Sequence, residues 1–146
     1  MTESEVTVSE SGNGRYSEQI RIGDHTIYSD EPTSRGGTSR GPSPYELIMA
    51  ALGACTAMTI RMYAERHDMP LRRTTVRLKH YKLPAINDVG ALDYFERTIG
   101  LDGDLTEEQR LRLLQISEKC PVSQTLRHSA TIDSRLATTP CEENTT

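Results

Sequence analysis

A long apolar segment between two prolines is the feature that most constrains the fold of this chain. Ser43 is a typical N-cap, Pro44 suits the first helical position, and Glu46 completes a Ser-x-x-Glu capping box. Pro70 forbids continuation of a helix, so we expect the helix to end near His67. Its first half is apolar on every face, which in a water-soluble protein indicates burial against several elements at once.

Short segments of alternating apolar and polar residues predict strands on both sides of this helix. Residues 6–8, 20–22 and 26–28 alternate, and the turn residues between them favour a three-stranded meander. Residues 30–42 are rich in Gly, Pro and small polar residues, so we expect a loop there. Alternation at 75–79 and 95–101 predicts a second hairpin around an irregular segment at 83–93.

The C-terminal third predicts a second helix and a last strand. Acidic residues after Asp104 favour a helix N-terminus, and Leu111, Leu114 and Ile116 form its expected apolar stripe. Pro121 breaks this helix directly after Cys120, and a last strand at 129–136 precedes a polar tail. The chain therefore predicts a single α+β domain over 1–146, with flexible tails at about 1–4 and 138–146.

Composition limits the partners of the protein. The net charge is −4 and the basic residues are spread along the chain, which argues against a nucleic-acid-binding face. The start lacks the pattern of a secretory signal, and the longest nearly apolar run, 47–58, falls short of the ~20 residues that cross a bilayer. We therefore expect a cytoplasmic protein with neither a nucleic-acid nor a membrane partner.

The same composition predicts a second copy of the chain. A central helix that is apolar all round needs more covering surface than a few strands and one amphipathic helix supply, and the chain has one Phe and no Trp. We expect an obligate homodimer whose long helices pack near the two-fold axis.

Two cysteines lie in unlike settings and suggest a redox couple. Cys55, inside the apolar helix, either packs as a small hydrophobe or is a reactive thiol, and the neighbouring Gly53 and Thr56 favour the second interpretation. Cys120 lies at a helix break. A new turn starting at Pro121 would place its thiol at an N-cap, which lowers a thiol pKa, whereas the end of the preceding helix would raise it.

Other candidates for chemistry are charged side chains in the first half of the chain. Glu46 is either only a cap or also orients an arginine beside a thiolate, and Arg15, Arg35 and Arg40 lie in Gly-rich segments that can bend inward. Cys141, in the polar tail, is expected to be a bystander. The four histidines lack metal-ligand spacing, so we expect neither a metal nor a cofactor.

Two segments resemble the OsmC/Ohr family of osmotically inducible and organic-hydroperoxide-resistance proteins. They are residues 41–58, Gly-Pro-Ser-Pro-Tyr-Glu-Leu-Ile-Met-Ala-Ala-Leu-Gly-Ala-Cys-Thr-Ala-Met, and residues 118–122, Glu-Lys-Cys-Pro-Val. The resemblance implies an α+β fold with an N-terminal β-meander and a long buried helix. It also implies an intertwined homodimer with active sites at the subunit interface, and thiol-dependent reduction of organic hydroperoxides.

By position, the resemblance implies that Cys55 attacks the peroxide and becomes a sulfenic acid, which Cys120 captures as a disulfide. A dithiol such as a lipoyl group, or a small thiol, would then reduce that disulfide. The catalytic glutamate of the peroxidase branches usually stands where this chain has Tyr45, one residue before Glu46. The Pro-Tyr-Glu-Leu motif at 44–47 is more similar to an OsmC-like branch described only as redox proteins. The resemblance also implies an arginine that supports the Cys55 thiolate. Arg15 is the first choice for this residue and Arg40 the second.

Two alternatives stay open at this level. The chain could be a non-catalytic module of the same fold that binds an apolar ligand, with incidental cysteines. It could also act on protein thiols, as a disulfide reductase or a thiol/disulfide redox regulator.

Overall fold

The computed structural model describes residues 4–87 and 90–139, which divide into two compact units. The first unit contains the described residues 4–47 and 131–139, and the second contains 48–87 and 90–130. Each unit is described by itself. Cys141 and most of the predicted flexible tails lie outside the described residues.

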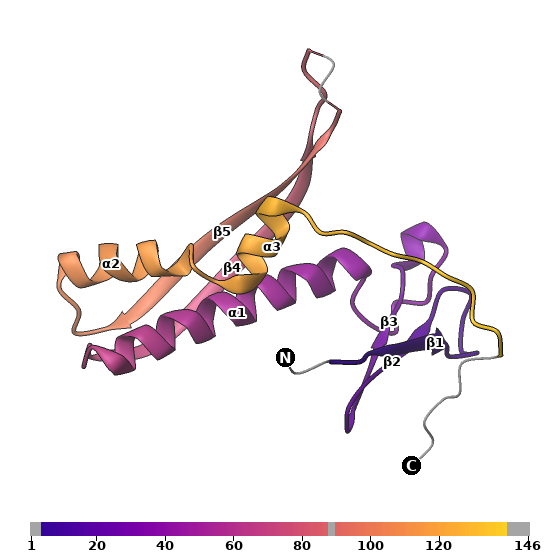
Figure 1. Ribbon diagram of the computed structural model, residues 1–146, viewed down its shortest axis with the longest axis horizontal. Coiled ribbons are helices and arrows are strands. Elements are labelled where there is room, and N and C mark those ends of the chain that lie inside the picture. The colour runs from indigo at the N-terminus through magenta and orange to yellow at the C-terminus, as the bar shows by residue number, and fades with distance from the viewer. Residues whose placement is uncertain (1–3, 88–89, 140–146) are drawn as a thin grey trace. The chain divides into compact units, whose positions relative to one another are not determined.

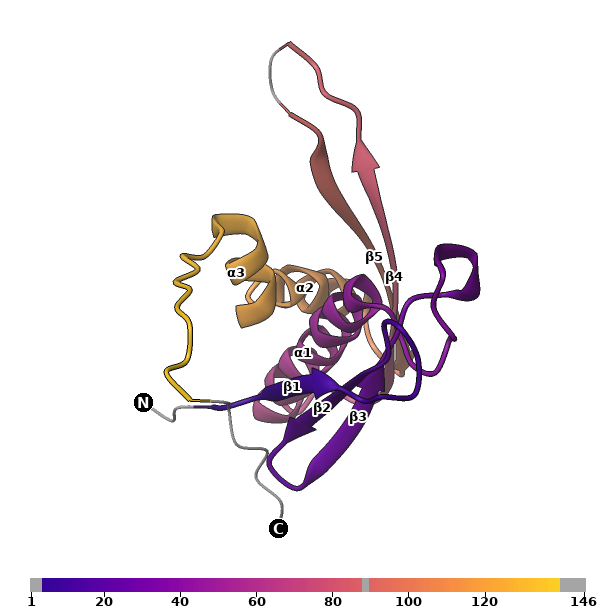
Figure 2. The same ribbon diagram turned by 90° about the vertical axis from the view of Figure 1, so that its right-hand side faces the viewer.

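The first unit is built on a three-stranded antiparallel sheet, as the sequence predicts. Its strands are β1 (Thr7–Glu10), β2 (Glu18–Ile22) and β3 (His25–Ser29), with β2 in the centre (Figures 1 and 2). The register places Ile20 opposite both Val8 and Ile27, so apolar side chains of all three strands lie on one face.

The loop after β3 is ordered around a buried carboxylate. Apart from the short 3-10 helix η1 (Thr33–Arg35), residues 30–42 form no regular element, as predicted. Asp30 accepts a hydrogen bond from the Thr38 hydroxyl at 2.5 Å and others from the backbone N–H groups of Glu31, Thr38 and Arg40. The Thr38 hydroxyl bond, followed by these backbone bonds, holds the pKa of Asp30 below its ordinary value, against the opposing effect of burial. The loop therefore has a defined shape.

The long helix α1 spans Pro44–Arg66, within one residue of the predicted bounds. The capping box forms: Ser43 N–H donates to Glu46 Oε2 at 3.0 Å, and Glu46 N–H donates to Ser43 Oγ at 3.4 Å. By length and composition α1 could also cross a membrane, a property that the core helices of water-soluble proteins share.

Within a single chain, α1 is buried along one face. Only one stripe at four-residue spacing is buried, formed by Leu52, Thr56, Ile60 and Ala64. The side chains of Met58 and Met62 are 59% and 55% exposed. The other elements of the second unit therefore cover only one face of α1, in line with the expectation that the elements of one chain do not cover this helix.

The second unit pairs this helix with a long hairpin and two shorter helices. The hairpin strands are β4 (Leu71–Leu83) and β5 (Leu92–Gly103), and the helices are α2 (Glu107–Ser117) and α3 (Pro121–His128). The strands are longer than predicted, and their turn end extends beyond the helices (Figures 1 and 2). At Gly53 the helix approaches β4 closely: a Cβ there would lie 2.8 Å from Leu78 Cδ1.

The core of the second unit lies where α1, β4 and α2 meet, and its buried members are Ile60, Ala64, Leu71 and Leu113. On α2 the buried side chains are Leu113, Ile116 and Ser117, whereas Leu111 and Leu114 are about half exposed. The predicted stripe was therefore wrong in two of its three members. Ile116 and Ser117 lie three and four residues after Leu113, which is the spacing of one helix face.

The last predicted strand, at 129–136, does not form. These residues have no strand pairing within the described chain, and Ile132 and Leu136 are largely exposed. Their alternation matches a strand, but a strand requires a neighbouring strand to pair its backbone groups, and neither sheet of the described chain includes this segment.

Candidate active site

Two sulfur atoms from remote parts of the chain lie together in the second unit. Cys55 projects from α1, Cys120 precedes α3, and each thiol shifts the pKa of the other. Both are free thiols; Cys55 is half-buried and Cys120 is 0% exposed. The fold thus brings together the two cysteines that the sequence identifies as a couple.

The path of the chain around Pro121 sets the environment of Cys120. Pro121 occupies the first turn of α3, and the Cys120 carbonyl accepts the first helical bond from Gln124 N–H at 3.1 Å. Cys120 is therefore the N-cap, as predicted. The backbone N–H groups of Val122 and Ser123, at the start of α3, contribute to lowering the pKa of its thiol.

The two thiols differ in acidity. Burial, followed by the hydrogen bond to Cys120, raises the pKa of Cys55. Burial also opposes ionisation of Cys120, but hydrogen bonds from the Cys55 thiol, the Ser123 N–H group and the Thr56 hydroxyl together hold the pKa of Cys120 below its ordinary value. Within the second unit, the anion is therefore favoured at Cys120 rather than at Cys55.

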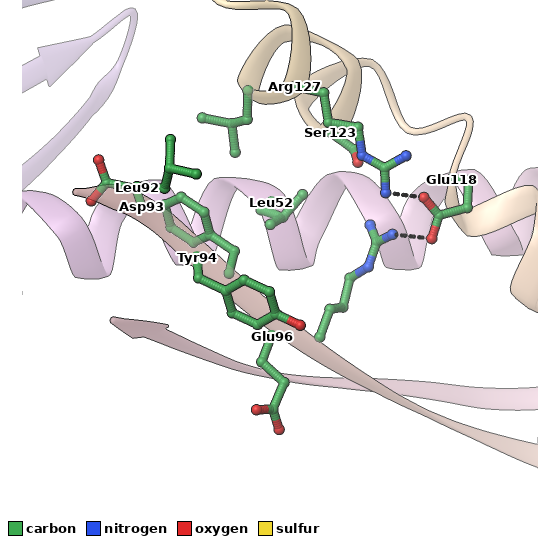
Figure 3. Close-up of a pocket in the computed structure, with 11 residues that line it drawn as sticks. Leu52, Leu92, Asp93, Tyr94, Glu96, Glu118, Ser123 and Arg127 are labelled. Carbon is green, nitrogen blue, oxygen red and sulfur yellow. Dashed lines mark hydrogen bonds and ion pairs between the residues drawn. The ribbon is translucent and has the colours of Figure 1, made fainter. Parts of the chain in front are cut away.

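A buried arginine stands next to this pair. Arg97, on β5, has a side chain only 10% exposed. Its Nη1 donates to Thr56 Oγ1 at 2.8 Å, and its Nη2 donates to Glu118 Oε1 at 3.1 Å. Glu118 also binds Arg127, so the carboxylate is held between two guanidinium groups (Figure 3).

Sequence reasoning missed Arg97, although a signal was present. Phe95, Arg97, Ile99 and Leu101 recur at every second position, so the arginine lies on the apolar face of its strand. A charged residue on such a face is buried only when it has partners. Its partners, Thr56 and Glu118, are 41 and 21 positions away, and no local pattern identifies them.

A cavity of about 570 Å³ opens beside the thiol pair. Figure 3 shows part of its wall, where Leu52 and Leu92 face aromatic and charged side chains. Neither cysteine is part of the lining, but Leu52 lies one turn before Thr56 on α1 and Ser123 lies in the first turn of α3. The residues that line the cavity are Leu52, Leu92, Asp93, Tyr94, Phe95, Glu96, Arg97, Glu118, Ser123, Leu126 and Arg127.

The other predicted site residues lie in the first unit. Glu46 is engaged in the capping box with Ser43. Arg15 has its guanidinium 5.9 Å from the centre of the Tyr16 ring. Arg35 ends η1, and the backbone N–H of Arg40 donates to Asp30.

Comparisons with known proteins identify the fold. Residues 36–135, more than half of the chain, match a family model described as OsmC-like protein. No curated protein matches the chain.

Several solved structures resemble the chain at low sequence identity, and these likenesses show the fold alone. An OsmC-like protein from Mycoplasma pneumoniae has a TM-score of 0.71 and 15% identity, with 86% of this chain and 88% of that chain covered. An organic hydroperoxide resistance protein OsmC from Legionella pneumophila has a TM-score of 0.66 and 18% identity, over 87% and 90%. An organic hydroperoxide resistance protein from Elizabethkingia anophelis has a TM-score of 0.65 and 19% identity, over 87% and 89%.

Proposed function

Because the chain belongs to the OsmC-like protein family, we propose that it is a thiol-dependent peroxidase that reduces organic hydroperoxides through Cys55 and Cys120. The observation that carries the proposal is the interaction of these two thiols, whose positions are 65 residues apart. Two neighbouring thiols suit a peroxidase, since one must be oxidised and the other must capture the product.

The proposed cycle has three steps. The Cys55 thiolate attacks the terminal oxygen of the hydroperoxide, the O–O bond breaks, and the alkoxide leaves and takes up a proton as an alcohol. Cys55 is then a sulfenic acid. Attack by Cys120 on its sulfur forms the disulfide and releases the oxygen as water, and an external dithiol of the lipoyl type, or a small thiol, supplies two electrons to restore both thiols.

Partial exposure of Cys55 and complete burial of Cys120 support this division of roles. Only Cys55 has access to an external substrate, whereas Cys120 needs to reach only its partner. The adjacent cavity has apolar side chains from Leu52, Tyr94 and Leu126, which suit an alkyl or aryl group. By position in the family, Glu46 and Arg15 are the proposed carboxylate and guanidinium of the catalytic site.

We further propose that the protein is a homodimer located in the cytoplasm. The support for a dimer is the apolar face of α1 that its own chain leaves exposed at Ala51, Ala54, Met58 and Met62. Such a continuous face on one helix is typical of a protein-protein contact.

The cavity also supports a second candidate, a non-catalytic module that holds an apolar ligand. In that case the thiols would be incidental, and removal of either would leave ligand binding intact.

Consumption of an organic hydroperoxide separates the two candidates. The assay uses tert-butyl hydroperoxide with dihydrolipoamide or with dithiothreitol, on the parent protein, Cys55→Ser and Cys120→Ser. The peroxidase proposal predicts turnover in the parent, loss of turnover in Cys55→Ser, and overoxidation of Cys55 in Cys120→Ser. Equal, slow consumption by all three proteins would favour the binding module.

A further inference from the structure

The hydroxyl group of Thr56 lies between a guanidinium group and a thiol. Thr56 is 0% exposed and follows Cys55 directly in the chain. Its Oγ1 accepts a hydrogen bond from Arg97 Nη1 at 2.8 Å and donates one to the Leu52 carbonyl at 2.7 Å. The same hydroxyl is one of the groups that hold the pKa of Cys120 below its ordinary value.

This hydroxyl has one proton and two candidate acceptors: the Leu52 carbonyl, which accepts it in the structure, and the Cys120 sulfur, whose pKa the hydroxyl lowers. Because Arg97 donates to Oγ1, that proton is directed either to the Leu52 carbonyl or to the Cys120 sulfur. A neutral thiol is a weak acceptor, so the carbonyl receives the proton while Cys120 is protonated. A thiolate is charged and binds hydrogen-bond donors more strongly, so ionisation of Cys120 favours rotation of the hydroxyl toward sulfur.

Arg97 is fixed in the geometry that this arrangement requires. Its second nitrogen binds Glu118, and Arg127 holds the same carboxylate from the other side. Glu118 precedes Cys120 by two residues, so the network joins β5, α1 and the turn that carries the thiol. Burial of the guanidinium limits its screening by solvent.

We propose that Arg97 is a positioning residue for disulfide formation, acting through the Thr56 hydroxyl to hold the Cys120 sulfur as the attacking anion. The inference rests on the proposed function for the origin of the Cys55 sulfenic acid. In the step concerned, the Cys120 anion attacks the Cys55 sulfur, the S–S bond forms and the S–O bond breaks. The departing hydroxide takes up a proton and leaves as water.

The test measures formation of the Cys55–Cys120 disulfide with diamide, a diazene that accepts two electrons and two protons from a thiol pair to become a hydrazine. Diamide replaces the hydroperoxide, so the result does not depend on peroxidase activity. All proteins carry Cys141→Ser, and the rate is followed against pH. Arg97→Met and Thr56→Val should slow the reaction about tenfold near neutral pH, the effect of losing one hydrogen bond to a charged group, and should shift the pH profile upward.

Three controls distinguish this role from a purely structural one. Thr56→Ser keeps the hydroxyl and should retain the parent rate and pH profile. Arg61→Gln loses two hydrogen bonds to the backbone carbonyls of Leu71 and Arg72 and should leave the profile unmoved. The double variant Arg97→Met with Thr56→Val should be no slower than either single variant, because both act through one hydroxyl.

An unchanged pH profile in Arg97→Met, or effects of the two substitutions that multiply, would overturn the inference. If the full pattern appears with diamide but the protein does not reduce hydroperoxides, the proposed function fails while the role of Arg97 stands.

Discussion

Arg97 and Thr56, 41 positions apart, are joined by a hydrogen bond of 2.8 Å from the guanidinium group to the hydroxyl. The bond connects the hairpin to the helix that carries Cys55, and the Thr56 hydroxyl in turn lowers the pKa of Cys120. A structural arginine could pair with Glu118 alone. Because this one also binds the buried hydroxyl of Thr56, it joins β5 to the helix that carries Cys55.

The two thiols should titrate on opposite sides of the ordinary thiol pKa. In a Cys141→Ser background, Cys55→Ser leaves Cys120 as the remaining thiol and keeps a hydroxyl donor beside it. The absorbance of the Cys120 thiolate should therefore appear at a pH below the ordinary thiol pKa. Cys120→Ser leaves Cys55, whose burial should place ionisation above that value. Ultraviolet titration checks both, with each variant unfolded in urea as its reference. Ionisation of Cys55 before Cys120 would contradict the assignment.

The capping box predicts separable effects at Glu46. Glu46→Ala removes the bond to Ser43 N–H and should lower the free energy of unfolding by about 1 kcal/mol, whereas Glu46→Gln keeps an acceptor there and should change it little. Because the proposed catalytic role needs the negative charge, Glu46→Gln should nevertheless reduce hydroperoxide turnover. Urea unfolding and the peroxide assay measure the two properties. Full turnover in a stable Glu46→Gln protein would restrict Glu46 to capping.

The buried carboxylate of Asp30 predicts that the free energy of unfolding depends on pH. Its pKa is lowered in the folded protein, so its contribution to stability is complete above the unfolded value and is lost as the pH falls through the folded value. Asp30→Asn should be less stable than the parent near neutral pH, and the difference should shrink below the ordinary value of 3.8. Urea unfolding of both proteins across this range is the measurement. A difference that does not depend on pH would show that the charge is unimportant.

If the exposed face of α1 forms the interface of the proposed dimer, a charge introduced there should dissociate the dimer. Met58→Glu and Met62→Glu place a carboxylate on this face and should convert a dimer into monomers, because an unpaired charge is costly in an apolar interface. Asp24→Lys, in the turn between β2 and β3, is the control and should leave the mass unchanged. Light scattering after gel filtration measures the mass. A parent protein that is monomeric at all concentrations would refute the dimer.

Local sequence signals predicted the elements that local physics determines. The capping box at Ser43, the meander and the N-cap position of Cys120 each depend on neighbours within a few residues, and all three were confirmed. The family resemblance added the pairing of Cys55 with Cys120. Both segments that carry the resemblance, 41–58 and 118–122, lie within the matched residues 36–135.

The features that the sequence did not predict depend on partners that are remote in the sequence or absent from one chain. Arg97 gains its role from a hydroxyl 41 positions away. Residues 129–136 alternate as a strand does, but no neighbouring strand pairs with them within the described chain. The elements of its own chain reach only one face of α1, and the sequence predicts that a second copy covers the remainder.

The most direct test of the redox couple is the product of one oxidation. Fully reduced protein is treated with one equivalent of tert-butyl hydroperoxide, quenched with an alkylating agent, and analysed by intact mass and peptide mapping. The proposed function predicts loss of two hydrogen atoms and a linked pair of peptides that contain Cys55 and Cys120, with Cys141 alkylated. Recovery of Cys55 and Cys120 as alkylated thiols, with the hydroperoxide unconsumed, would contradict it.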